Sequence, residues 1–193
     1  MRIIAGELKG RKLNAPTWEG LRPTSDKLRE TLFNVIAQRV PGARVLDLYA
    51  GTGAMGIEAL SRGAAHATFV EKDARALKLI GENLQRCGVS DRHAIIRLRL
   101  DGVTPPSLTA ASFDLIVLDP PYDEPDLSAA IAPAERLMAP GALLVLEHAR
   151  RRPAPEQVGD LIMTRLLISG DSALAFYRIG SAIAAPPDQN AGG

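Results

Sequence analysis

Residues 45–56, VLDLYAGTGAMG, decide the expected fold of this chain because they combine an apolar strand, a glycine turn and the start of a helix. The glycines at positions 51, 53 and 56 form the pattern G-x-G-x-x-G, which lets the backbone turn tightly and approach a ligand closely. Glu71 lies 20 residues after Gly51, at the end of the next predicted strand. A carboxylate there can accept hydrogen bonds from both hydroxyls of a ribose. The stretch therefore predicts a βαβ unit with a site for an adenosine-containing cofactor.

The chain around this unit alternates between apolar strands and helices. Strands are predicted at 45–49, 67–71, 94–100, 113–118 and 142–148, and helices at 54–62, 73–87 and 127–138. Near-continuous apolar strands separated by helices are typical of a parallel sheet with both faces covered. Two further strands, 161–168 and 173–179, flank the short turn SGDS, and so short a connection joins only antiparallel strands. We therefore expect a seven-stranded, mostly parallel sheet with an antiparallel last strand.

The N-terminal region differs from the rest in pattern and in charge. Short strands at 2–6 and 10–13 predict a β-hairpin, and Thr24 or Ser25 is expected to cap the first helix. Residues 1–44 hold nine basic and four acidic side chains, whereas the whole chain has a net charge of only +1. Such a basic segment is either a contact surface for a polyanion or a solvated basic face. The predicted organisation is a basic extension at 1–23, one domain at 24–180 and a disordered tail at 181–193.

Composition excludes several classes of protein. The 193 residues are 46% hydrophobic and 23% charged, as is usual for one globular domain. No apolar run approaches the roughly 18 residues of a membrane span, and the N-terminus lacks the apolar core of a signal peptide. The single cysteine, Cys87, excludes an internal disulfide and supplies too few thiols for a zinc site. We expect a cytoplasmic protein without a metal.

Two aspartates bear on the identity of the cofactor. Asp47 lies four residues before Gly51, where an anion suits the amino group or sulfonium of S-adenosylmethionine and would repel the pyrophosphate of NAD. An antiparallel last strand also favours the methyltransferase version of this sheet. Asp101 closes the third strand and can accept a hydrogen bond from an adenine amino group, or it can serve as a turn or helix-capping residue.

The fourth strand ends in LDPPYD, residues 118–123. Asp119 supplies carboxylate acceptors, and a proline carbonyl accepts although its nitrogen cannot donate. The corner is thus a rigid set of acceptors, complementary to an –NH₂ group, and Tyr122 offers a ring on which a planar base can stack. Hydrogen bonds from both N–H groups would draw the amine nitrogen toward tetrahedral geometry and free its lone pair. The corner predicts methylation of the exocyclic amine of a planar ring.

Together these motifs resemble the RsmD family, the bacterial 16S ribosomal RNA guanine-N2 methyltransferases. The resemblance spans residues 1 to about 180 and rests on the segments RIIAGELKGRKLNAP, LRPTSDKLRETLFNVI, DLYAGTGAMGIEALSRGA, FVEKD, FDLIVLDPPYDEPD and GALLVLEHAR. It implies a class I, Rossmann-like methyltransferase fold with the N-terminal hairpin as an extension, and S-adenosyl-L-methionine as the cofactor. It also implies 16S rRNA as the partner, within a small-subunit assembly particle, and a monomeric enzyme.

The resemblance assigns roles by position. The cofactor-binding residues would be Asp47, Ala50, Gly51, Thr52, Gly53, Glu71, Lys72, Asp101 and Gly102. The catalytic residues would be Asp119, Pro120, Pro121 and Tyr122, with Asp119 and the Pro120 carbonyl on guanine N2. RNA would meet Arg2, Lys9, Arg11, Lys12, Arg22 and Thr24. Tyr49 and Met55 stand where the family commonly has Phe and Leu, and the turn at 168–171 lacks an aromatic residue often found near there.

Several alternatives remain open at the level of sequence. An adenine also presents an –NH₂, so a DNA or RNA adenine-N6 methyltransferase fits the same corner, and a protein-glutamine methyltransferase fits it less well. An NAD-dependent oxidoreductase would use the glycines but leave DPPY unexplained, and a non-catalytic RNA-binding module would not need Asp119. Cys87 is expected to be a packed hydrophobe and His148 a structural residue. The run 150–152, three arginines, is either solvated or in contact with phosphates.

Overall fold

The computed structural model describes residues 1–18, 25–99, 108 and 112–180. The helices are α1 (Asp26–Val35), the 3₁₀ helix η1 (Ala37–Arg39), α2 (Ala54–Ser61), α3 (Ala74–Arg86) and α4 (Leu127–Glu135). The strands are β1 (Arg44–Leu48), β2 (His66–Glu71), β3 (His93–Arg97), β4 (Phe113–Leu118), β5 (Met138–Ala149), β6 (Gln157–Val158), β7 (Leu161–Ser169) and β8 (Ser172–Ile179). The tail expected at 181–193 lies outside the described residues.

The strands form one sheet in the order β3-β2-β1-β4-β5-β8-β7-β6. The pairs from β3 to β5 are parallel, and β8 runs antiparallel to both β5 and β7. The antiparallel last strand is therefore confirmed, and the two-residue β6 adds an eighth strand to the seven expected. The order reverses between β1 and β4, and ligands of such sheets bind at the carboxyl ends of the strands at this switch point.

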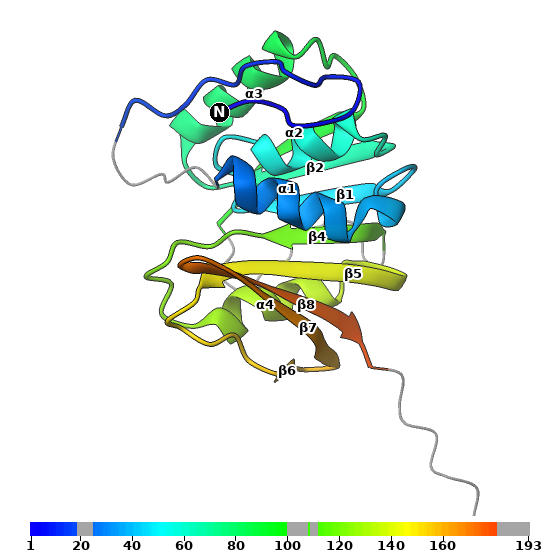
Figure 1. Cartoon of the computed structure of the whole chain (residues 1–193), viewed down its shortest axis with the longest axis vertical. Helices are drawn as coiled ribbons and strands as arrows, with labels where there is room; N and C mark the ends of the chain where they lie inside the picture. The colour runs from blue at the N-terminus through cyan, green and yellow to red at the C-terminus, as the bar shows by residue number, and fades with distance from the viewer. Residues whose placement is uncertain (19–24, 100–107, 109–111, 181–193) are drawn as a thin grey trace, which may run out of the picture.

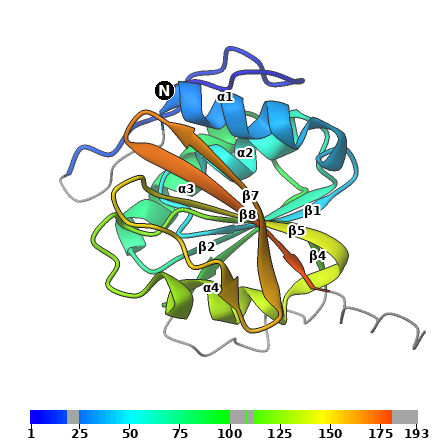
Figure 2. The same ribbon diagram turned by 60° about the horizontal axis from the view of Figure 1, so that its bottom comes forward.

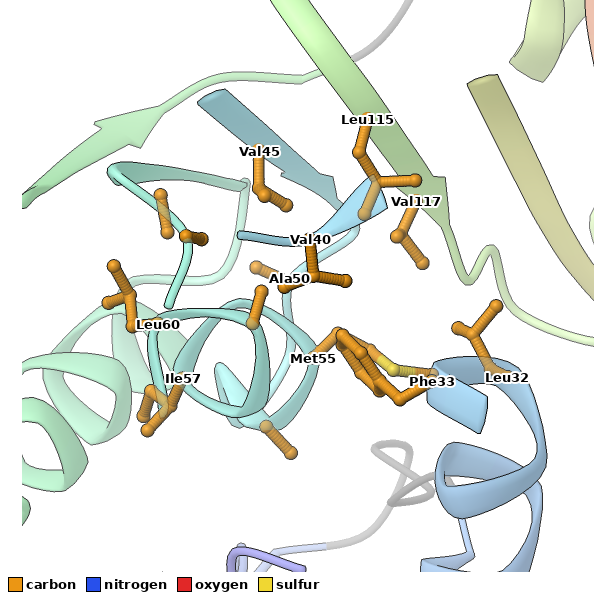
Figure 3. Packing of buried hydrophobic residues seen from close by; sticks show 14 of the residues in the cluster. Leu32, Phe33, Val40, Val45, Ala50, Met55, Ile57, Leu60, Leu115 and Val117 are labelled. Atoms are coloured by element: carbon orange, nitrogen blue, oxygen red, sulfur yellow. The ribbon is translucent and has the colours of Figure 1, made fainter. Parts of the chain in front are cut away.

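Helices cover both faces of the sheet. The buried side chains of α1, α2 and α3 join one cluster with Val45 and Val117, while those of α4 join a second cluster with Leu46 and Ile116. Figure 2 shows α4 on the opposite side of the sheet from α1 and α2, and Figure 3 shows part of the first cluster. Alternate strand residues enter opposite clusters because side chains of a strand point to opposite faces in turn. Both faces of the central sheet are buried, as the apolar character of the strands indicated.

The boundary between α4 and β5 differs from the expectation. The helix was predicted to reach Met138, but it ends at Glu135, and β5 begins at Met138 instead of 142. Pro140 disfavours helical geometry at the residue before it, so the segment is extended and Met138 pairs with Phe113. A register shift between Phe113 and Leu115 accommodates the additional residues.

The expected N-terminal hairpin is present in a short form, with an antiparallel bridge between Arg2 and Lys12. The two arms are also joined by backbone hydrogen bonds from the N–H of Ile3 to the carbonyl of Arg11 and from the N–H of Gly10 to the carbonyl of Ile3, both at 2.9 Å. The backbone between the arms bonds to α2 as well. The N–H groups of Ile4 and Ala5 donate to the buried carboxylate of Glu58 at 2.8 and 3.1 Å. Gly6 has a φ of +84°, and a Cβ there would lie 1.8 Å from the carbonyl oxygen of Ser61. The segment is thus a loop fastened to α2 (Figure 1).

A buried charge network strengthens this attachment. Arg29 of α1 is fully buried and lies 3.8 Å from Glu58. Its guanidinium also donates to the carbonyl of Arg2 and to Asp26 at 2.9 Å. At the start of α1, the hydroxyl of Ser25 accepts from the N–H of Leu28, so Ser25 is the cap that the sequence suggested; Thr24 lies outside the described residues.

Candidate active site

The glycine turn after β1 is backbone held in unusual conformations. Tyr49, Gly51 and Gly53 have φ values of 60°, 53° and 75°, and Tyr49 is the one non-glycine with positive φ among the described residues. Such backbone is strained for a side chain other than glycine and occurs mainly at functional sites. The N–H of Gly53 donates to the carbonyl of Ala50 at 2.7 Å, which closes the turn. The turn then leads directly into α2.

Asp47 on β1 is hydrogen-bonded to the backbone that follows the glycine turn. Its side chain is 2% exposed, and its carboxylate accepts from the N–H of Gly56 at 2.9 Å. Burial raises the pKa of Asp47 well above its usual range; the Gly56 hydrogen bond opposes this, and the nearby Asp119 and Glu71 raise the pKa further. The carboxyl groups of Asp47, Asp119 and Glu71 therefore interact electrostatically at this edge of the sheet.

Glu71 at the end of β2 binds the same turn from its other side. One carboxylate oxygen accepts from the N–H of Gly51 at 3.0 Å, and the other accepts from the N–H groups of Lys72 and Asp73 at 2.7 and 3.0 Å. A carboxylate offers about four acceptor positions, so acceptor capacity remains for a hydroxyl. The side chain of Lys72 is exposed.

Asn83 on α3 joins the turn to the N-terminal segment. Its amide is fully buried and donates to the carbonyl of Thr52 at 2.9 Å. The same amide accepts from the N–H of Asn14 at 2.7 Å and donates to the Asn14 carbonyl at 3.3 Å. Sequence reasoning missed this residue; the available signal was an asparagine on the inner face of an amphipathic helix.

The LDPPYD corner lies beside the glycine turn because β1 and β4 are paired. Leu48 and Leu118 are partners in the parallel ladder, and the N–H of Asp119 donates to the carbonyl of Leu48 at 3.3 Å. Asp119 is half-buried, Pro120 is buried and Pro121 is exposed. The structure therefore brings the predicted catalytic residues and, among the predicted cofactor residues, Asp47, the turn at 50–53 and Glu71 to one edge of the sheet.

Tyr122 is held at both ends. Its hydroxyl lies 2.5 Å from the hydroxyl of Ser172 on β8 and donates to Glu147 on β5 at 3.3 Å. Its backbone carbonyl accepts from the guanidinium of Arg152 at 3.2 Å. A small cavity beside the corner is lined by residues that include Pro120, Leu127, His148 and Arg152. The orientation of the ring is thus set by β5, β8 and the loop after β5.

Tyr49 is a second tyrosine near the corner that the sequence singled out only as a departure from the family pattern. Burial raises its pKa to about 12, and the carboxylates of Glu124 and Glu71 add to the effect. A phenol with this pKa is protonated at neutral pH and can donate a hydrogen bond.

The predicted RNA-contacting side chains of Arg2, Lys9, Arg11 and Lys12 are all exposed on the N-terminal loop, which runs over α2 and α3 (Figure 1). Arg11 also donates to the carbonyl of Cys87 at 2.6 Å, which fastens the loop to the end of α3. Cys87 itself is buried, as expected. The predicted residues Arg22, Thr24, Asp101 and Gly102 lie outside the described part of the chain.

No group of three or more His, Cys, Asp or Glu side chains among the described residues is arranged to hold a metal ion. In the same part of the chain, no helix has the length and apolar character needed to cross a membrane.

Known proteins resemble this chain over most of its length. A family model described as "Conserved hypothetical protein 95" matches residues 1–178. The curated ribosomal RNA small subunit methyltransferase D of Haemophilus influenzae is 36% identical over 157 residues, covering 79% of this chain and 81% of that protein. The solved structure of a hypothetical protein from Thermus thermophilus is 31% identical, with a TM-score of 0.73 and coverage of 91% and 98% of the two chains.

A more distant structure bears on the fold. The RNA methyltransferase from Salinibacter ruber, solved in complex with S-adenosyl-L-homocysteine, is 17% identical to this chain, with a TM-score of 0.64 and coverage of 87% and 100% of the two chains. At this level of identity the likeness concerns the arrangement of the sheet and helices, and it confirms the expected methyltransferase fold.

Proposed function

The chain belongs to the family described as conserved hypothetical protein 95, in agreement with the resemblance of its motifs to the RsmD family. From this premise we propose that it is an S-adenosyl-L-methionine-dependent ribosomal RNA methyltransferase. We further propose that the methyl group goes to the exocyclic N2 amine of a guanine in 16S rRNA. The observation that carries the proposal is the adjacency of the acceptor corner, Asp119–Pro120, to the glycine turn after β1.

The acceptor groups at the sheet edge fit this cofactor. Asp47, Glu71 and Asp119 give the edge a concentration of carboxyl groups, whose oxygens can accept hydrogen bonds from an amino group and from ribose hydroxyls. The turn residues Gly51 and Gly53 allow close approach of the ligand to the backbone. When bound, S-adenosylmethionine would supply an electrophilic methyl group whose leaving group is a neutral thioether.

The residues of the corner would act on the acceptor amine. Asp119 and the carbonyl of Pro120 would accept the two N–H hydrogen bonds, which localises the nitrogen lone pair. Because the leaving group is already good, alignment of the two reactants at roughly 3–3.5 Å can provide much of the acceleration. The proton would leave the nitrogen after transfer. Tyr122 would hold the base flat against the corner.

The basic N-terminal loop favours ribosomal RNA over other acceptors. Its four exposed cations lie on a segment fastened to α2 and α3, and the H. influenzae relative is a ribosomal RNA methyltransferase by its description. The substrate is proposed to be 16S rRNA within a small-subunit assembly particle, and the enzyme to act as a monomer.

The test is methyl transfer from labelled S-adenosylmethionine to small subunits purified from cells that lack the enzyme, followed by nucleoside analysis. N2-methylguanosine is the expected product, and N6-methyladenosine would contradict the proposal. Asp119→Ala should nearly abolish transfer while S-adenosylhomocysteine still binds in titration calorimetry. Parallel loss of binding and transfer would contradict the role given to Asp119.

A further inference from the structure

We propose that Arg152 is a positioning residue that holds the Asp119–Tyr122 corner in its working geometry, and that His148 holds Arg152 in place. The inference rests on the proposed function and deepens it, because it assigns a role to two residues that the motifs leave unexplained. Arg150 and Arg151 are exposed, whereas Arg152 is half-buried and its guanidinium hydrogen-bonds to the loop that carries the corner.

Arg152 connects the loop after β5 to the loop that carries the corner. One guanidinium nitrogen donates to the carbonyl of Tyr122 and another donates to the carbonyl of Pro125, each at 3.2 Å. The first carbonyl lies within the turn that the N–H of Glu124 closes with the carbonyl of Pro121 at 2.8 Å, and the second follows that turn directly. The planar guanidinium presents several donors in a fixed fork, so one side chain can fix both carbonyls at once.

His148 fixes the backbone of Arg152. The imidazole is 4% exposed, and its Nδ1 lies 2.9 Å from the carbonyl oxygen of Arg152. A carbonyl only accepts, so Nδ1 carries the proton in this contact. The N–H of Arg152 also donates to the carbonyl of Ala149 at 2.9 Å, which makes a tight turn at the end of β5. The backbone of Arg152, from which its side chain extends, is therefore held by a buried residue of the central sheet.

Two of the four residues of the corner cannot anchor it through a backbone donor. Pro120 and Pro121 have no N–H groups, so neither can donate a hydrogen bond that would fasten the segment to its surroundings. A small cavity lies on the side of the corner that faces His148 and Arg152, so close packing does not fill that side. Loss of the Arg152 fork would let the loop shift relative to β4.

Arg151 provides a matched control. It is exposed and adjacent in sequence, and its replacement by alanine removes the same unit of charge as Arg152→Ala. Both variants would reduce electrostatic attraction for RNA by a similar amount. Only Arg152→Ala removes the two hydrogen bonds to the corner.

The experiment compares methyl transfer by the wild type, Arg152→Ala, Arg152→Lys and Arg151→Ala. Because a misplacement of about 1 Å can cost roughly 100-fold in rate, we expect kcat to fall about 10- to 100-fold in Arg152→Ala with unchanged affinity for S-adenosylhomocysteine. Arg152→Lys keeps the charge but loses the fork and should recover kcat only in part. In Arg151→Ala, kcat should stay at the wild-type value. Equal kcat in the Arg151 and Arg152 alanine variants, or full recovery by lysine, would overturn the inference.

Hydrogen exchange of the peptide covering residues 122–127 gives a readout that does not depend on activity. Exchange should accelerate in Arg152→Ala and in His148→Ala, but stay near the wild-type rate in Arg151→Ala and in His148→Asn, whose side-chain amide keeps a donor. Unchanged exchange in Arg152→Ala would overturn the proposal that Arg152 braces the corner, that is, holds the Asp119–Tyr122 segment in place. If the wild type transfers no methyl group to any RNA, the proposed function fails, and the exchange comparison still decides whether the brace exists.

Discussion

Gly56, the last glycine of the turn pattern, provides a sharp test of how this fold is packed. It lies in the first turn of α2 and faces Phe69 of β2, so helix and strand approach closely at this point. A Cβ added to Gly56 would lie 2.3 Å from Cε1 and 2.7 Å from Cζ of the Phe69 ring. The ring is fully buried, so it cannot move away without displacing its neighbours. We predict that Gly56→Ala destabilises the protein.

The size of the effect follows from these distances. Ordinary contacts of a Cβ begin near 3.4 Å, so helix and ring must separate by about 1 Å. Overpacking of this kind costs about 1–3 kcal/mol and occasionally more, against a gain of up to about 1 kcal/mol from the better helix propensity of alanine. We expect a net loss of about 2 kcal/mol, which lowers Tm by roughly 4–8 °C for a chain of this size.

Gly81 of α3 is the matched control, because an added Cβ there meets nothing within 4 Å. The same substitution should therefore raise the free energy of unfolding by about 0.5–1 kcal/mol. Urea denaturation would measure both variants, together with Phe69→Leu and the double variant Gly56→Ala/Phe69→Leu. The smaller leucine should accept the new methyl group, so the double variant should be at least about 1 kcal/mol more stable than additivity predicts. Strict additivity, or a neutral Gly56→Ala, would refute the reasoning.

Three further outcomes are expected. Replacing Lys9, Arg11 and Lys12 together by alanine should weaken RNA binding and reduce its dependence on salt, because fewer counterions are released; an unchanged salt slope in filter binding would exclude these residues as phosphate contacts. Since burial raises the pKa of Asp47, the folded protein keeps a proton that the unfolded chain loses above about pH 4. The contribution of Asp47 to stability therefore declines as pH rises toward its raised pKa. In urea midpoints measured from pH 5 to 8, Asp47→Asn should show a smaller decline than the wild type. Equal slopes in the two proteins would contradict the assignment. Asn83→Ala should cost about 1–3 kcal/mol because it leaves buried backbone groups without a hydrogen-bond partner; calorimetry should also show weaker binding of S-adenosylhomocysteine, and unchanged affinity would count against its role at the turn.

Much of the fold could be predicted because the central strands are apolar and the glycine turn is distinctive. The strands from β1 to β4 begin within one residue of their predicted starts, since short apolar runs between turn signals have few alternatives. The two-residue β6 carries no such pattern. The end of α4 was misplaced because the segment after it, through Met138, continues an apolar pattern that also suits a helix.

The N-terminal loop shows why local pattern was insufficient there. The alternation in residues 2–6 indicates the pairing of Ile3 with the second arm. The N–H groups of Ile4 and Ala5, however, donate to Glu58, 54 and 53 residues away along the chain. A contact of that separation depends on where α2 lies, and nothing in the loop's own sequence specifies it.

The candidate site divides in a similar way. Asp47, Glu71 and Asp119 could be located because each lies at or next to the carboxyl end of a parallel strand, and all such ends meet at one edge of the sheet. Asn83 and Arg152 could not, because each acts on backbone carbonyls, of Thr52 and of Tyr122 respectively. Every residue type has a carbonyl, so no sequence pattern marks the partner of such a contact.

The position of β8 has a consequence for the synthesis of the chain. β5 is complete at Ala149, but its partner β8 ends at Ile179, 30 residues later. At about 5–20 residues per second, the edge of β5 stays unpaired for roughly 1.5–6 s. Unpaired edges of apolar strands are templates for aggregation. A chain that stops before Ser172 would carry Asp47, Glu71 and the whole corner, yet it would present an open sheet edge and associate with other chains before it could act on RNA.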